Sequence, residues 1–138
     1  MNRRKQLDTR LLTGVLIVHA FASLFHHVHN ATFLTAYPNL PSTLSVLNVY
    51  AAWAAVTTIG VVGFVLVRFK HFAPGLLALA IYGACGLDGL AHYFVADFSS
   101  HTRMMHASIL FEVASGLLLI MLAARTAVQA KRMGALRS

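Results

Sequence analysis

The sequence predicts an all-α integral membrane protein, a bundle of four transmembrane helices with both termini in the cytoplasm. Hydrophobic residues make up 58% of the 138 residues and charged residues only 11%, whereas a soluble domain carries about 25% charged residues. The apolar residues fall into four long runs. Almost all Lys and Arg residues lie before the first run, between the second and third runs, or after the fourth. This composition excludes an ordinary cytosolic enzyme, a disordered chain and a secreted disulfide scaffold. We treat residues 1–138 as a single membrane domain.

Each run is close to the ~20 residues that cross a hydrocarbon layer as a helix. Helices are expected because a lone span must satisfy its own backbone hydrogen bonds. Proline and polar residues at 37–42 separate the first two runs, Pro74-Gly75 opens the third, and residues 97–100 interrupt the chain before the fourth. The predicted helices are 11–29, 44–67, 75–95 and 104–124.

Orientation follows from the Lys and Arg residues, which concentrate in cytoplasmic segments. In a four-span arrangement only Arg103, of the 11 cations, falls on the opposite side. We therefore place both termini in the cytoplasm of a bacterial inner (plasma) membrane. The cations on the predicted cytoplasmic side are Arg3, Arg4, Lys5, Arg10, Arg68, Lys70, Arg125, Lys131, Arg132 and Arg137.

The first run also has features of a cleavable signal peptide. A basic start precedes it, and Ala20-Phe21-Ala22 resembles a cleavage site of small residues. Cleavage would leave three spans and an outside N-terminus. His19 next to that site and the continuing apolar run argue against cleavage.

Ionisable side chains inside the spans are the most informative residues, because they are costly in a membrane and usually serve function. A helix rises ~1.5 Å per residue, so the depth of each side chain in the membrane can be estimated. In the four-span topology, histidines from three helices and one aspartate lie at a similar depth, in the outer third of the membrane. Glu112 and His19 fall deeper, near the midplane, where they are expected to pair. His27 is expected to point away from the other histidines of its helix. The candidates at the outer level are His26, His29, Asp88, His92, His101 and His106.

This set predicts a transition-metal site near the outer face. Imidazoles with a carboxylate in a bundle interior suit copper, zinc or iron. We place His26, Asp88, His92 and His106 at its centre, with His29 and His101 as additional ligands. The thioethers at positions 104 and 105 would favour copper.

The arrangement of Asp88 and His92 followed by His106 resembles the Asp/His/His metal site in the C subunit of particulate methane monooxygenase. The resemblance is confined to residues 88–106 and needs an insertion of a single residue. It implies copper as the bound metal.

Glu112 and His19 are predicted to be catalytic or proton-handling groups beside the metal, which would support redox chemistry or metal handling. One alternative is a non-enzymatic accessory subunit or carrier, either a homo-oligomer or part of a larger membrane complex. A second is a bis-His haem b protein, in which Gly83, Gly86 and Gly89 make room for the porphyrin. A third is a metal-free acid–base membrane enzyme using Glu112 with a histidine.

Besides the lipid bilayer, the expected partner is a metal ion or a larger membrane complex. Nucleic acid is not expected. The net charge of +7 arises from short basic blocks between apolar runs. Nucleic-acid binding would need a basic face on a soluble domain.

Overall fold

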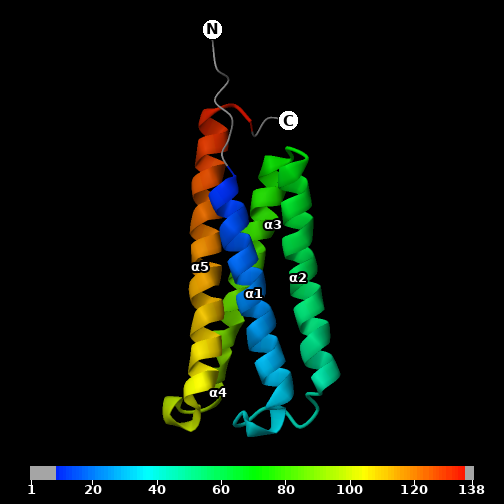
Figure 1. Cartoon of the computed structure of the whole chain (residues 1–138), viewed down its shortest axis with the longest axis vertical. Coiled ribbons are helices and arrows are strands. Elements are labelled where there is room, and N and C mark those ends of the chain that lie inside the picture. The colour runs from blue at the N-terminus through cyan, green and yellow to red at the C-terminus, as the bar shows by residue number, and fades with distance from the viewer. Residues whose placement is uncertain (1–8, 136–138) are drawn as a thin grey trace.

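A computed structural model describes residues 9–135, in which every regular element is helical (Figure 1). Four helical spans are long and apolar enough to cross a membrane, which confirms the predicted all-helical architecture of four spans. The third span is a succession of three elements. The elements are α1 (Arg10–Thr32), η1 (Leu34–Ala36), α2 (Val46–Arg68), α3 (Phe72–Cys85), η2 (Gly86–Ala91), α4 (His92–Val95), η3 (Phe98–Ser100) and α5 (Arg103–Arg132).

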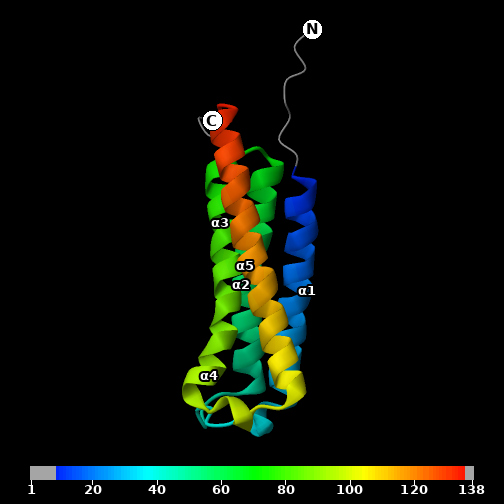
Figure 2. The ribbon, with the colours of Figure 1, turned by 90° about the vertical axis from the view of Figure 1, so that its left-hand side faces the viewer.

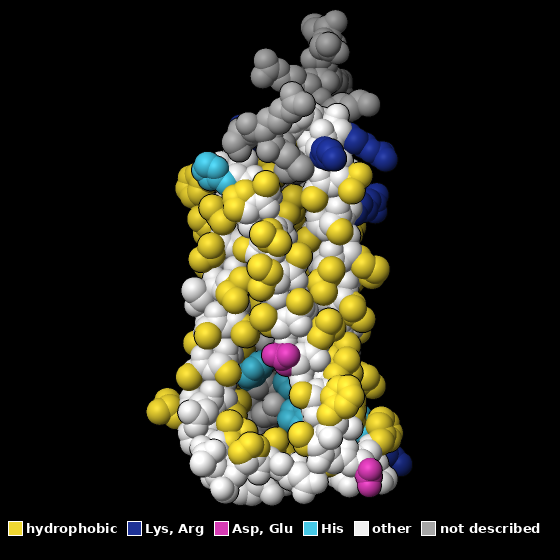
Figure 3. Space-filling view, turned by 180° about the vertical axis from the view of Figure 1, so that it is seen from behind, with side chains coloured by type: hydrophobic (Ala, Val, Ile, Leu, Met, Phe, Trp, Pro, Cys, Tyr) yellow, Lys and Arg dark blue, Asp and Glu magenta, His cyan; other side chains and the backbone are white. Residues whose placement is uncertain are grey.

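The four spans form a ring in which α1 packs against α2 and α5, and α3 packs against the same two helices. Figures 1 and 2 show them running side by side. We call the end where α1 begins and α5 finishes the terminal end, and the opposite end, with residues 33–45 and 96–102, the loop end. Figure 3 shows hydrophobic side chains over the middle of one face and most visible Lys and Arg near the terminal end. The basic residues in 1–8 and 136–138 lie outside the described residues.

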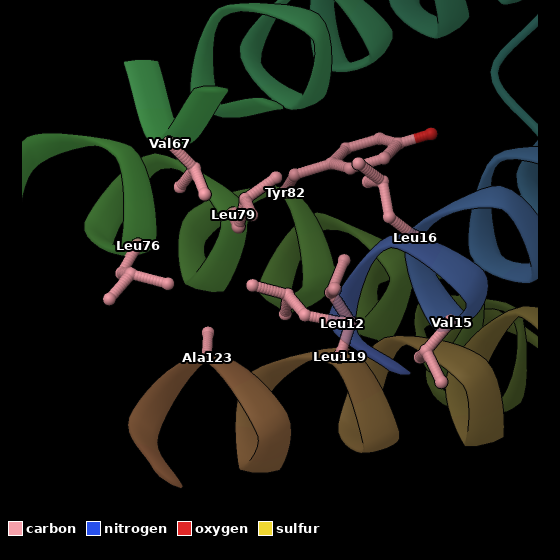
Figure 4. Close-up of a cluster of buried hydrophobic side chains, with 9 residues drawn as sticks. All are labelled: Leu12, Val15, Leu16, Val67, Leu76, Leu79, Tyr82, Leu119 and Ala123. Carbon is pink, nitrogen blue, oxygen red and sulfur yellow. The ribbon is translucent and has the colours of Figure 1, made fainter. Parts of the chain in front are cut away.

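The apolar core lies in the terminal half of the bundle, and Figure 4 shows its side chains. Leu79, Tyr82 and Leu119 are 1%, 1% and 0% exposed, and they pack with leucines of α1. The buried histidines and the buried glutamate lie at or beyond the loop-end border of this cluster. The bundle therefore has an apolar half and a polar half along its axis.

The third span differs from its prediction as one continuous helix over 75–95. It is α-helical only to Cys85, and the chain then tightens into the 3₁₀ segment η2 before α4. Gly86 and Gly89 lower the helix propensity of this segment. A Cβ on Gly86 would lie 2.5 Å from Cε1 of His19, so the glycine lets the third span approach α1 closely. Such breaks inside helices often mark functional sites.

The fourth span is also longer than its prediction of 104–124. The apolar run ends near residue 124, but α5 continues to Arg132. Residues 127–132 are mostly strong helix formers, and Thr126 and Ala130 are buried. Hydropathy alone missed this extension because the buried face continues on small and polar residues.

Candidate functional site

A polar cavity of about 230 Å³ lies in the loop half of the bundle. Figure 3 shows it as a hollow with histidine side chains inside and an acidic side chain at its rim. All four spans contribute to its lining. The lining residues are His26, His27, Asn30, Ala52, Val56, Cys85, Asp88, Gly89, His92 and Glu112.

His26 is held in a defined orientation by α5. It is 3% exposed, and its Nδ1 lies 3.3 Å from Oγ of Ser108. Because the Ser108 hydroxyl donates to the Met105 carbonyl at 3.0 Å, Ser108 accepts from His26 Nδ1–H. The proton is then on Nδ1, and the lone pair of His26 Nε2 is directed into the cavity.

The Nε2 atoms of two histidines from different spans converge on one amide nitrogen. Asn30 Nδ2 lies 3.0 Å from Nε2 of His26 and 3.5 Å from Nε2 of His92. The two imidazole rings are 5.5 Å apart between centroids. Asn30 Oδ1 is buried without a hydrogen-bond partner among the described residues. The lone pairs on Nε2 of His26 and His92 therefore point to one position, which the N–H group of the Asn30 amide occupies.

Glu112 supplies a carboxylate to the same cavity from α5 and is 3% exposed. Its Oε2 lies 3.7 Å from Nε2 of His26, and its Oε1 lies 3.8 Å from Nδ1 of His27. These separations are too long for hydrogen bonds. His27 Nδ1 donates instead to the Ser23 carbonyl at 2.9 Å. The carboxylate is thus close to two imidazoles without being bonded to either.

His19 lies outside the cavity rather than beside Glu112. It is 0% exposed, its Nε2 donates to the Tyr82 carbonyl at 3.3 Å, and its Nδ1 lies 3.0 Å from Oγ of Ser115. Its ring also contacts the edge of Tyr82 at 4.7 Å. Both ring nitrogens are occupied, so the environment of His19 is that of a packed core residue.

Asp88 lines the cavity from η2 and is exposed. Cys85 and His92 line the same wall, so the sequence spacing correctly placed these three residues on one face. Asp88 therefore stands between the cavity and the surface of a membrane-spanning segment.

His29, one of the predicted ligands, is engaged outside the cavity by the connection between α1 and α2. The Tyr37 hydroxyl lies 2.8 Å from its Nδ1. Burial raises the pKa of Tyr37 to about 12, so this hydroxyl stays protonated beside the His29 ring.

His101 and His106 also lie outside the cavity lining, in an aromatic cluster at the loop end. His101 Nδ1 donates to the Asp97 carbonyl at 3.1 Å. His106 stacks on Phe98 at 3.9 Å between ring centroids, and its Nδ1 lies 2.9 Å from the Tyr93 hydroxyl. Of the predicted metal ligands, the structure therefore brings His26, Asp88 and His92 together, and it adds Glu112.

Asn30 and His27 line the cavity but were not among the candidate ligands. Asn30 lies one helical turn after His26 and shares its face, so its spacing was a usable signal. His27, expected to point away, lines the cavity because its ring folds back to the Ser23 carbonyl. That contact depends on the side-chain rotamer and gave no signal in the sequence.

The donor chemistry fits a metal ion, although the donor atoms do not surround a single point. Within residues 9–135, no three His, Cys, Asp or Glu side chains are grouped closely enough to hold a metal ion. The cavity offers imidazole nitrogens and two carboxylates but no thioether. Met104 is 55% exposed, and the sulfur of Met105 lies 3.4 Å from the Thr102 backbone nitrogen.

Of the three glycines expected to make room for a porphyrin, Gly83 and Gly86 are used for close packing, whereas Gly89 lines the cavity. A Cβ on Gly83 would lie 2.7 Å from the Gly116 carbonyl oxygen, and Gly86 faces His19. These positions bring backbones together, as small residues do in membrane helix interfaces.

Comparison of the chain with protein-family models, curated proteins and solved structures gives no significant match.

Proposed function

We propose that the polar cavity binds a divalent transition-metal ion between α1 and the third span. The protein would lie in a bacterial inner membrane with both termini in the cytoplasm, so that the loop end and the cavity face outward. The proposal depends above all on one observation, the convergence of Nε2 of His26 and Nε2 of His92 on Asn30 Nδ2.

The charge of the cavity favours a cation. Its ionisable lining consists of Asp88, Glu112, Cys85 and three histidines, and none of the described Lys or Arg residues contributes to it. Carboxylates at this depth in a membrane are costly unless they are paired or bind a metal. A bound divalent cation would offset both carboxylates at once.

One donor–donor distance is close to that of a ligand pair. Two ligands about 2.1 Å from a tetrahedral ion lie about 3.4 Å from each other. Glu112 Oε2 and His26 Nε2 are 3.7 Å apart, so a small rotamer change would bring them onto one ion. The Asn30 amide would have to turn aside, and its unpartnered Oδ1 could then face the cation. The Ser108 contact to Nδ1 is the kind of second partner that orients metal-binding histidines.

The imidazole nitrogens of His26 and His92 and the carboxylate oxygens of Glu112 suit Zn²⁺, Fe²⁺ or Cu²⁺. A redox-active ion would supply electron transfer here, and a redox-inert one would be held for transfer. In either case His26, His92 and Glu112 hold the ion, and Asp88 faces the opening. The same site would serve an enzyme or an accessory subunit of a larger membrane complex.

The proposal is tested by metal analysis of the detergent-purified protein after loading with zinc, iron or copper in turn. We expect the wild-type protein to retain a stoichiometric amount of one of them. His26→Ala and His92→Ala should each lower the affinity by about 100-fold, because each removes a ligand whose supporting contacts alone contribute about 10–100-fold. His71→Ala is the matched control, since His71 is exposed at the α2–α3 connection.

Two results would contradict a metal site in the cavity. One is a wild-type protein that retains none of the three metals after loading. The other is a metal content in His26→Ala and His92→Ala equal to that of the His71→Ala control.

A further inference from the structure

The cavity is covered at the loop end by the connection between α1 and α2. Tyr37 is 4% exposed, and its ring packs on His92 at 4.8 Å between centroids. Its hydroxyl bonds to His29, and Asn39 Nδ2 donates to the Val95 carbonyl at 2.8 Å. These contacts fasten the connection to α1 and to the third span. Tyr37 thus separates the His92 side of the cavity from water at the loop end.

The cavity is open on its side instead. α2 packs along α3 but makes no comparable contact with η2 or α4, so the two spans part towards the loop end. The hollow in Figure 3 opens on this face. Its α2 wall is small and apolar, formed by Ala52 and Val56, and Asp88 is exposed on the other wall.

We propose that this side opening admits a lipid-dissolved molecule with a hydrogen-bond-donating head, of the phenol class, from the bilayer. The role of this molecule rests on the proposed function, because the molecule would meet the bound metal in the cavity. The path by which the molecule enters is inferred from two observations, the covered loop end and the open side of the cavity. Binding alone is proposed, with no chemical step.

The chemistry of the cavity selects this class of ligand. Asp88 faces the opening and is not among the residues proposed to hold the metal, so its carboxylate oxygens are acceptors at the entrance. A head that donates a hydrogen bond complements them, and an apolar body suits the Ala52 and Val56 wall. A neutral hydroxyl reaches this depth without the penalty that the bilayer imposes on a charged amine.

Cys85, the single cysteine of the chain, lines the cavity and reports on access to it. In lipid nanodiscs we expect a lipid-soluble N-alkylmaleimide to modify Cys85, and a charged water-soluble maleimide to react about tenfold more slowly, because the two share one reactive group and differ in access to the thiol. Ala52→Phe should slow the lipid-soluble maleimide by narrowing the opening. Ala51→Phe, on the same helix but outside the cavity lining, should not. Tyr37→Ala should raise the rate of the charged reagent.

The ligand class is tested with a 4-alkylphenol and its methyl ether. The phenol should protect Cys85 from the lipid-soluble maleimide, and the ether, which cannot donate a hydrogen bond, should not. Equal protection by both compounds would overturn the ligand class. Equal rates for the two thiol reagents, or no effect of Ala52→Phe, would overturn the side route. Metal content is measured on the same samples. If the protein retains no metal but Cys85 is labelled as expected, the proposed function is overturned and the side route stands.

Discussion

We expect His19→Ala to lower the free energy of unfolding by about 3 kcal/mol. The substitution removes a fully buried ring and leaves a cavity, and buried ring-to-alanine changes cost about 3–5 kcal/mol. It also removes the imidazole from the Tyr82 carbonyl and from the Ser115 hydroxyl, which keeps its bond to the Glu112 carbonyl. Reversible unfolding in mixed detergent, followed by circular dichroism, measures the change.

The same variant separates a structural role of His19 from the catalytic role that its depth suggested. Because His19 lies outside the cavity lining, the metal content per folded chain should equal that of the wild type. His71→Ala again provides the exposed control and should leave stability unchanged. A stable His19→Ala protein that has lost its metal would show that His19 acts at the site.

The second large effect is expected at the contact between α3 and α5. A Cβ on Gly83 would lie 2.7 Å from the Gly116 carbonyl oxygen, and one on Gly116 would lie 2.5 Å from the Gly83 carbonyl oxygen. The two backbones therefore touch, and a methyl group must push the helices apart. We expect Gly83→Ala to destabilise the protein by about 1–3 kcal/mol, as overpacked cores do, and to lower the thermal midpoint in detergent.

Gly14→Ala is the matched control for this prediction. Gly14 lies in α1 with no atom within 4 Å of an added Cβ. Alanine should stabilise that helix by up to about 1 kcal/mol through its higher helix propensity. Equal thermal midpoints for the two variants would contradict the close α3–α5 packing.

Much of the fold could be predicted because bilayer thickness and backbone hydrogen bonding constrain a membrane helix strongly. The four apolar runs correspond to the four spans. The break at Gly86 was missed, because it depends on the approach of His19 from another helix. The extension of α5 to Arg132 was missed because its buried face there is carried by Thr126 and Ala130 rather than by large apolar residues.

The sequence predicted the depth of the candidate residues in the membrane, but it did not predict the rotation of each helix about its own axis. Alternating direction of the spans brought His26, Asp88 and His92 to one level, and the structure places them in one cavity. The same reasoning included His106, whose ring is held instead by Phe98 and Tyr93. Which face a helix turns inward depends on packing against its neighbours, and a single sequence does not determine that packing.

The central claim is that His26 and His92 bind one metal ion together with carboxylate oxygen. X-ray absorption spectroscopy of the metal-loaded protein tests it most directly. We expect two imidazole nitrogens and the remaining ligands oxygen, at about 2.0–2.2 Å for zinc, with one imidazole lost in His26→Ala and one in His92→Ala. A sulfur-ligated ion, or an imidazole count unchanged in both variants, would contradict the claim.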